Sequence, residues 1–273
     1  MTEPRMIPVV DGVELALWQQ GHGPVPLVLL HGYSLGAGTW DRVLPLLPAD
    51  RFTIYRYEQR GFGHSSKPDS GHSMTIHAHD LKALLDRLDI DRAVLAGHSL
   101  GGAISQEFAT LWPGRLRAVV SCNALARHRE LPGMDAAKRA RIAAYGTTEQ
   151  NRRVFEASVP NYFDPRNRDP ETLAFFVEMA LRASTAALRE QLHDAYAASP
   201  LEAARFAALD LPVLALTGAT DPVASPEQSI ALAEAVPGSE IAIIPRAGHT
   251  PMWERPEEWT RIVLEFLARR LGA

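Results

Sequence analysis

Short apolar runs rich in Val, Ile and Leu recur along the chain, and longer stretches with apolar residues at helical spacing lie between them. This alternation is typical of a parallel sheet covered by helices, since strands that are buried on both faces read as continuous apolar runs. The runs predict buried strands at 25–30, 52–57, 93–97, 116–121, 213–217 and 241–244. The helical spacing predicts helices near 75–88, 100–112, 226–235 and 256–271.

The N-terminal residues predict two further strands. Asp11-Gly12 is a dipeptide that favours a tight hairpin turn, and residues 13–19 after it alternate between apolar and polar. We expect residues 7–10 and 13–19 to pair as an antiparallel edge. The predicted fold class is therefore α/β, with an eight-stranded, mostly parallel sheet flanked by helices.

The alternation of strands and helices stops between residues 124 and 210. Ala, Arg, Glu and Leu at helical spacing dominate there, and no run typical of a buried strand occurs. We interpret 124–210 as an inserted helical cap, and 1–123 together with 211–273 as the core. Residues 161–170 hold two prolines among Asp, Asn and Arg, which predicts a loop between cap helices.

Composition and charge narrow the class of protein. With 46% hydrophobic and 22% charged residues among 273, the chain matches ordinary globular usage. Its formal charge of −4 lacks the basic excess that nucleic acid and anionic membrane surfaces select, so neither is expected as a partner. A single cysteine, Cys122, excludes an internal disulfide. Because no signal peptide or membrane span is visible, we expect a cytoplasmic location.

The pentapeptide GHSLG at 97–101 follows a predicted strand and precedes a predicted helix. A serine on such a sharp strand-to-helix turn adopts a strained backbone and presents its hydroxyl as a nucleophile. The residues two before and two after it must lack side chains to avoid collision, and Gly97 and Gly101 meet that need. Ser99 is therefore the predicted nucleophile, with a simple helix N-cap as the structural alternative.

A second pentapeptide, GYSLG at 32–36, fits the same pattern around Ser34. Gly36, Ala37 and Gly38 follow that serine and make a poor helix start, whereas a continuous amphipathic helix is predicted after Ser99. We therefore interpret Ser34 as a loop hydroxyl.

A serine nucleophile needs a base, and the base needs a group that orients it. His249 lies in a loop after the last predicted strand, and Asp221 directly follows the strand before it. Sites form at the carboxyl ends of strands in open α/β sheets. The order Ser99, Asp221, His249 is one in which such triads occur. The acid could instead follow the 116–121 strand, but the residues there are Cys122 and Asn123, and neither has a carboxylate.

Acyl transfer also needs hydrogen-bond donors for the oxyanion that develops. The backbone amide of Leu100, directly after the nucleophile, is one predicted donor. The other is the amide of Tyr33, in the loop after the 25–30 strand. His31 at the start of that loop is expected to order the loop rather than to take part in the chemistry.

Two other segments could suggest a metal site and a dinucleotide-binding loop, and we expect neither. His77 and His79 beside Asp80 do not share a helix face, so no metal site is expected there. Residues 60–66 lack the third glycine of a dinucleotide-binding loop. We expect neither a metal nor an organic cofactor.

These motifs together resemble the α/β-hydrolase superfamily, in its capped, single-domain form. The segments that carry the resemblance are His31-Gly32-Tyr33, YEQRGFGHS at 57–65, GHSLGG at 97–102, Asp221 and Gly248-His249. Within the superfamily the chain is most similar to 3-oxoadipate enol-lactonase-like esterases and to cofactor-free haloperoxidases, which are also perhydrolases. Serine at position 99 departs from the epoxide hydrolases and haloalkane dehalogenases, whose nucleophile is aspartate.

The resemblance implies hydrolysis of a small-molecule carboxylic ester or lactone through an acyl-enzyme, with Ser99, His249 and Asp221 as triad. Three alternatives stay open: a haloperoxidase or perhydrolase, a C–C bond hydrolase, and a ligand receptor with slow turnover. His98 and Trp253 are expected to line the substrate pocket. The cap arginines Arg127, Arg129 and Arg141 are expected on solvated helix faces.

Overall fold

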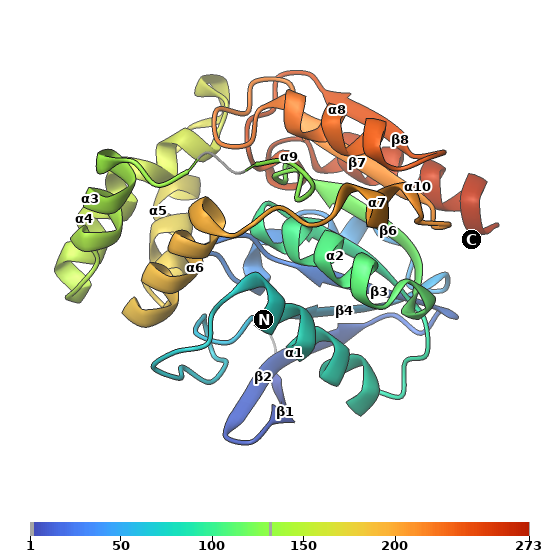
Figure 1. Ribbon diagram of the computed structural model, residues 1–273, viewed down its shortest axis with the longest axis horizontal. Coiled ribbons are helices and arrows are strands. Elements are labelled where there is room, and N and C mark those ends of the chain that lie inside the picture. Colours follow the sequence, from blue (N-terminus) through green and yellow to red (C-terminus); the bar gives the residue numbers. More distant parts are fainter. Residues whose placement is uncertain (1–2, 131–132, 273) are drawn as a thin grey trace.

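An eight-stranded sheet forms the centre of the structure, a computed structural model that describes residues 3–130 and 133–272 (Figure 1). The spatial order of the strands is β1-β2-β4-β3-β5-β6-β7-β8. The strands are β1 (Arg5–Val10), β2 (Val13–Gln20), β3 (Val25–Leu30), β4 (Phe52–Tyr57), β5 (Ala93–His98), β6 (Leu116–Cys122), β7 (Val213–Gly218) and β8 (Glu240–Ile244).

The pairing of the strands confirms the predicted fold class. Strand β2 pairs antiparallel with β1 and with β4, and all other neighbours are parallel. Gly12 at the predicted hairpin has a φ of +74°, which glycine adopts without strain. Strand β1 begins two residues earlier than predicted because Arg5 pairs with Leu17 of β2. The other strand ends differ from the prediction by one residue at most.

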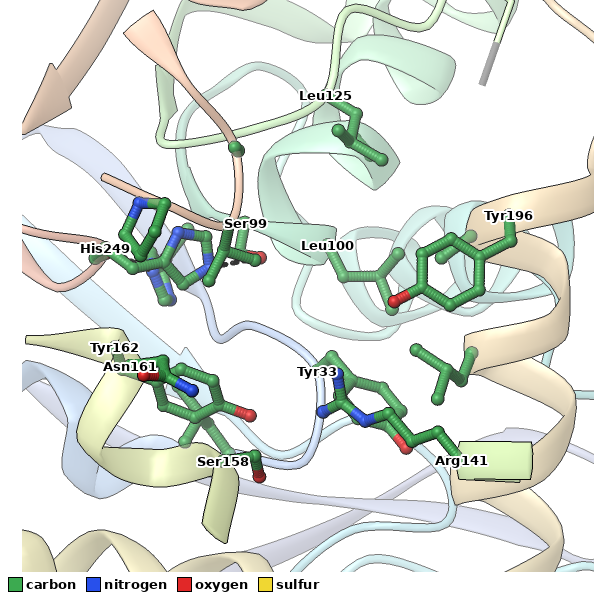
Figure 2. Close-up of a pocket in the computed structure, with 18 of the residues that line it drawn as sticks. Tyr33, Ser99, Leu100, Leu125, Arg141, Ser158, Asn161, Tyr162, Tyr196 and His249 are labelled. Atoms are coloured by element: carbon green, nitrogen blue, oxygen red, sulfur yellow. Dashed lines mark hydrogen bonds between the residues drawn. The ribbon is translucent and has the colours of Figure 1, made fainter. Parts of the chain in front are cut away.

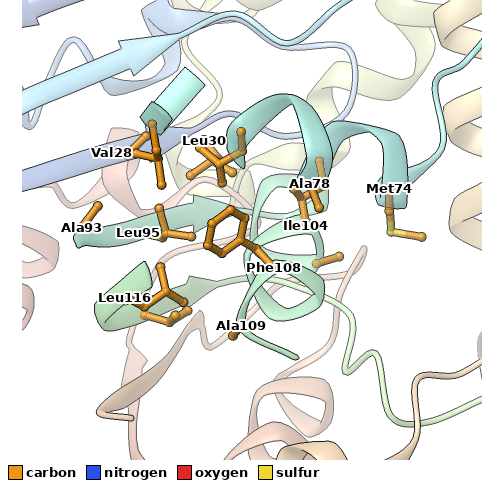
Figure 3. Close-up of a cluster of buried hydrophobic side chains, with 14 of the residues drawn as sticks. Val28, Leu30, Met74, Ala78, Ala93, Leu95, Ile104, Phe108, Ala109 and Leu116 are labelled. Carbon is orange, nitrogen blue, oxygen red and sulfur yellow. The ribbon is translucent and has the colours of Figure 1, made fainter. Parts of the chain in front are cut away.

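Helices cover both faces of the sheet, and alternate strand residues point to opposite faces. On one face Val28 and Leu30 of β3 pack in a cluster with helices α1 (Met74–Arg87), α2 (Leu100–Leu111) and α8 (Pro226–Ala235). Figure 3 shows Phe108 and Ile104 of α2 against this face. On the other face, Leu27 and Leu29 of β3 pack with α9 (Pro251–Glu254) and α10 (Pro256–Leu271). Two-sided burial explains why these strands read as uninterrupted apolar runs.

Every regular element that the structure describes between β6 and β7 is a helix. Figure 1 shows α3 (Ala136–Ala144), α4 (Thr148–Ser158), α5 (Pro170–Ala180) and α6 (Thr185–Ala197) gathered beyond one end of the sheet; we call these four the cap helices. They share an apolar cluster that includes Phe155, Phe163 and Phe176. The next helix, α7 (Ala203–Ala207), instead places Phe206 in the core cluster. Division into a core and a cap at 124 and 210 stays a prediction.

Polar side chains set where several cap helices begin. Thr147 and Gln150 form a reciprocal capping box at the start of α4, and Asp169 caps α5 by accepting from the amide of Thr172. Short 3-10 turns complete the structure: η1 (Ala37–Trp40), η2 (Leu44–Leu46), η3 (Pro113–Arg115), η4 (Val159–Tyr162) and η5 (Pro165–Asn167). The last of these lies in the segment predicted to be a loop. Within the described residues, no helix is both long and apolar enough to cross a membrane.

Candidate active site

Ser99 lies on a sharp turn between β5 and α2, at the carboxyl edge of the sheet. Its φ of 52° and ψ of −117° are a strained combination for a residue with a side chain. A Cβ added to Gly97 would lie 2.3 Å from the carbonyl oxygen of Gly101. A Cβ added to Gly101 would lie 2.4 Å from the carbonyl oxygen of Leu30. Both glycines are therefore needed for the close packing that holds Ser99 in this conformation.

The structure brings Ser99, His249 and Asp221 together in one hydrogen-bonded chain. Ser99 Oγ lies 2.8 Å from His249 Nε2 (Figure 2), and His249 Nδ1 lies 2.8 Å from Asp221 Oδ2. With Nδ1–H donating to the carboxylate, Nε2 is free to accept the serine proton. The side chains of Asp221 and His249 are 0% and 5% exposed, so water cannot compete for this contact.

Four donors hold the Asp221 carboxylate in place. Oδ2 accepts from His249 and from Asn123 Nδ2 at 2.7 Å, and Oδ1 accepts from the amides of Val223 and Ala224. Burial raises the pKa of this carboxyl, but the charge and hydrogen bond of His249, with Asn123 and Val223, outweigh burial, and the pKa is lowered. Asp221 is therefore ionised at neutral pH and fixed in orientation.

The main chain of His249 is held by groups far away in the sequence. Its amide donates to the carbonyl oxygen of Tyr162 in η4 at 2.8 Å. Its carbonyl oxygen accepts from His98 Nε2 at 2.7 Å. Burial lowers the pKa of His98 to about 3, so this imidazole is neutral and its Nε2 carries a proton to donate. The adjacent amide of Gly248 donates to Glu254 Oε1 at 2.8 Å.

The loop after β3 is ordered by His31, as the sequence predicts. His31 Nδ1 lies 2.8 Å from the carbonyl oxygen of Gly32, and its Nε2 accepts from the amide of Gln59. Burial lowers the pKa of His31, consistent with a neutral ring that both donates and accepts. Within the described part of the chain, the amides of Tyr33 and Leu100 donate to no other protein group. Both predicted oxyanion donors are therefore available to a ligand.

A cavity of about 450 Å³ opens beside Ser99 and His249. His98, which was expected at the pocket, lines it, and so do Tyr33 and Leu100, the two expected oxyanion donors. The cap helices supply part of its wall (Figure 2). Further lining residues are Leu35, Ala103, Leu125, Lys138, Arg141, Ser158, Asn161, Tyr162, Leu192, Ala195, Tyr196, Pro222, Val223 and Ala224.

Trp253, predicted to line the pocket, is not among the residues that line this cavity. Its indole is stacked on Phe175 with ring centroids 5.1 Å apart, and the guanidinium of Arg42 lies over the Trp253 ring at 4.5 Å from its centroid. The tryptophan follows His249 closely in sequence, but α9 turns its ring away from the cavity and into the apolar cluster of the cap helices.

The other candidate residues lie outside the hydrogen-bonded chain of Ser99, His249 and Asp221. Ser34 is fully buried, with a φ of 58°, and does not line the cavity. His77 Nε2 accepts from the Gln191 side chain, and Asp80 is paired with Arg60. Among the described residues, no group of three or more His, Cys, Asp or Glu side chains is arranged to hold a metal ion.

The three cap arginines differ in their surroundings. Arg127 is buried and paired with Glu107 at 3.4 Å, whereas Arg129 is exposed. Arg141 lines the cavity. The expectation that all three lie on solvated helix faces is therefore wrong for Arg127 and Arg141. Helical spacing alone does not show which face of α3 points toward the sheet, because the packing of the cap helices decides it.

Sequence reasoning also missed three residues that hold the candidate triad. Asn123 follows β6 at the carboxyl edge of the sheet, and that position was a usable signal although its side chain is no acid. Glu254 lies five residues after His249, with no recognisable motif. Tyr162 acts through its carbonyl oxygen, which every residue type has, so no sequence signal exists for it.

Comparisons with known proteins place this geometry in a family. A sequence model of the alpha/beta hydrolase fold matches residues 25–256. A 2-hydroxy-6-oxo-2,4-heptadienoate hydrolase from Pseudomonas putida is 31% identical over 285 residues, which cover 97% of this chain and 96% of that relative.

Two solved structures have the same fold along nearly their whole length. A thermophilic esterase from Thermogutta terrifontis has a TM-score of 0.83 and 28% identity, covering 98% of this chain and 99% of the other. The enol-lactonase from Burkholderia xenovorans has a TM-score of 0.85 and 26% identity, covering 96% and 99%. These matches confirm the resemblance that the motifs indicate, and the chain belongs to the alpha/beta hydrolase family.

Proposed function

We propose that this protein is a serine hydrolase that cleaves a carboxylic ester or lactone through an acyl-enzyme. The observation that carries the proposal is the hydrogen-bonded chain from Ser99 through His249 to Asp221, whose serine end opens on a cavity. A nucleophile, a base within reach and a group that orients the base are the parts that this chemistry requires.

In the first half of the reaction, Ser99 Oγ attacks the carbonyl carbon and its proton passes to His249 Nε2. The carbonyl oxygen becomes an oxyanion and accepts from the amides of Tyr33 and Leu100, each worth about 3 to 4 kcal/mol in such sites. Asp221 stabilises the imidazolium that forms. When the intermediate collapses, the C–O bond breaks and the leaving alkoxide takes the proton from His249.

In the second half, His249 removes a proton from a water molecule, and the resulting hydroxide attacks the acyl carbon. The bond between this carbon and Ser99 Oγ breaks, Ser99 recovers its proton from His249, and a carboxylic acid leaves. In a lactone, the alcohol and the acid belong to one product. All these steps use side chains and backbone groups of the chain itself.

A second candidate function is hydrolysis of a C–C bond. It is favoured by the 31% identity to the heptadienoate hydrolase over nearly the full length of both chains. The two reactions share the groups that activate a nucleophile and bind an oxyanion, and they differ in the leaving group. Loss of the absorbance of a dienone acid on incubation with the protein would support this candidate over ester hydrolysis.

The test is steady-state hydrolysis of p-nitrophenyl esters of increasing acyl length. Ser99→Ala is the test variant, and Ser34→Ala is the matched control, since both serines lie in a GxSxG sequence and have positive φ. We expect kcat to fall by about 10⁴-fold or more in Ser99→Ala, with the fold intact, and to stay within about threefold in Ser34→Ala. Near-normal turnover in Ser99→Ala would refute the proposal. Release of one equivalent of p-nitrophenol without further turnover would instead favour a ligand receptor.

A further inference from the structure

One wall of the cavity carries a positive charge away from the serine. Arg141 projects from α3, and Figure 2 shows its guanidinium extending into the cavity beside Tyr33, across from the Ser99–His249 pair. Its Cζ lies 6.0 Å from the centroid of the Tyr33 ring. Arginine stays protonated at any pH that the fold experiences, so this wall is permanently cationic.

Arg141, which is half-buried, differs from the buried arginines in having no carboxylate partner among the described residues. Arg56, Arg60 and Arg127 are each paired with a carboxylate, as expected for charges removed from water. For Arg141 no ion pair occurs among the described residues, and its Nε is buried without a hydrogen-bond acceptor. No Asp or Glu of the described chain lines the cavity, so its wall offers Arg141 no carboxylate.

The neighbours of Arg141 are hydroxyl groups. Tyr33, Tyr145, Tyr162 and Tyr196 all lie close enough to interact electrostatically with the guanidinium. Burial raises the pKa of Tyr33 and of Tyr145, so both hydroxyls keep their protons at neutral pH. The Tyr33 hydroxyl already donates to the carbonyl oxygen of Leu188 at 2.9 Å, and none of these protonated tyrosines can neutralise an arginine.

Two of the nearby hydroxyls also lack partners. Ser158 Oγ, in the cavity wall, and Tyr145 Oη, beside Tyr33, are buried and form no hydrogen bond with the described residues. Arg141 Nε and Ser158 Oγ, both from residues that line the cavity, are thus buried donors without an acceptor in the part of the chain that the structure describes. A carboxylate, which has two oxygens and only accepts hydrogen bonds, is the complement of such a set.

A second cation in the wall does not compete for this role. Lys138, one turn earlier on α3, is 2.8 Å from Asp135 and lies over the ring of Tyr196. Much of the remaining wall is apolar and includes Leu35, Leu100, Leu125 and Leu192. These side chains offer an acyl chain apolar contacts within the same cavity as Ser99 and Arg141.

We propose that the cavity selects substrates that carry a carboxylate at the end distant from the bond that breaks, and that Arg141 binds this carboxylate. The substrate class is then a monoester of a dicarboxylic acid, or a lactone with a carboxylate side chain. This inference rests on the proposed function for the reaction, and on the cavity alone for the recognition of the anion.

The kinetic test uses matched substrates. Mono-p-nitrophenyl esters of glutarate, adipate and pimelate are compared with esters of the same length whose far carboxylate is replaced by a carboxamide. For at least one length we expect kcat/KM to be about 10- to 100-fold higher for the carboxylate, the range for a charge-assisted pair. This preference should be lost in Arg141→Met and partly kept in Arg141→Lys. The control is Arg139→Met on the exposed face of the same helix, in which the preference persists.

A binding measurement separates the inference from the proposed function. Calorimetric titration with hexanoate and with hexanamide needs no turnover. We expect hexanoate to bind at least about tenfold more tightly than hexanamide. This difference in affinity should be lost in Arg141→Met and kept in Arg139→Met. Turnover of neutral esters without any preference for the carboxylate would overturn the inference and leave the serine hydrolase standing. Arg141-dependent binding of hexanoate without turnover would uphold the inference and refute the serine hydrolase. Equal affinity for both ligands would overturn the inference.

Discussion

Glu254 ties the His249 loop to the segment inserted between β6 and β7, and its replacement by glutamine tests how much this tie contributes to stability. Oε1 accepts from the amide of Gly248 at 2.8 Å and from the amide and hydroxyl of Thr250 at 3.3 Å. Oε2 accepts from the amide of Asp164 and from Asn167 Nδ2, both at 2.8 Å. Each of these partners is a donor, and the Thr250 hydroxyl shares its proton between Glu254 and the carbonyl oxygen of Tyr162.

The expected cost follows from the number of donors. A glutamine in this position presents one acceptor oxygen and one NH₂ group. In either orientation of the amide, at least two of the groups that donate to Glu254 lose their acceptor and face the NH₂ group instead. A hydrogen bond to a charged acceptor contributes about 1.5 to 3 kcal/mol. Because the side chain is partly accessible, we take the lower value twice and expect Glu254→Gln to lower the free energy of unfolding by about 3 kcal/mol.

Urea denaturation of the wild type and of Glu254→Gln measures this difference. Glu234→Gln, at an exposed position of α8, removes the same charge without these contacts and is expected to change stability by less than about 0.5 kcal/mol. Hydrogen exchange should show faster exchange at the amides of Gly248 and Asp164 in the test variant. A loss below about 1 kcal/mol, or unchanged exchange at both amides, would refute the reasoning.

Three further substitutions test other parts of the site. Asn123→Gly keeps the positive φ of that residue but removes the donor to Asp221, so kcat/KM for a p-nitrophenyl ester should fall about tenfold; an unchanged value would contradict the positioning role. Gly97→Ala places a Cβ 2.3 Å from the carbonyl oxygen of Gly101 and should lower the free energy of unfolding in urea by about 3 kcal/mol, whereas a neutral effect would show that the turn relaxes. Burial lowers the pKa of His98 from 6.5 to about 3, so below pH 6.5 the unfolded chain binds a proton that the folded chain does not. Its contribution to stability is present above pH 6.5 and is lost as the pH falls toward 3; between pH 7 and pH 5 the loss should be about 2 kcal/mol greater in the wild type than in His98→Gln, and equal losses would count against it.

Strands, core helices and the candidate triad could be predicted because each has a local signal in the sequence. The run at β3 is apolar over its full length, and the predicted bounds of β3 and β4 both agree with the structure. The Ser99 turn was identified by Gly97 and Gly101, whose missing side chains are a steric requirement. A single sequence is enough to predict a residue's role where both the residue type and its place after a strand carry information.

The cavity wall could not be predicted in this way, because it depends on packing between segments distant in sequence. Arg141 and Arg139 lie two residues apart on α3, yet only Arg141 lines the cavity. Trp253 follows the His249 loop directly, yet packs against Phe175 of α5. Such outcomes are set by how the cap helices pack, which the helical period of each segment does not reveal.

The carbonyl oxygen of Tyr162 and the amide of Asp164 belong to the inserted segment, yet one binds the main chain of His249 and the other shares Glu254 with the amide of Gly248. The segment that shapes the substrate cavity is thus also part of the scaffold of the histidine. It is not an interchangeable module: a chimera that carries residues 124–210 of a relative must also receive the matching histidine loop. Substitutions at 159–167 that reshape the cavity are therefore expected to shift His249 as well.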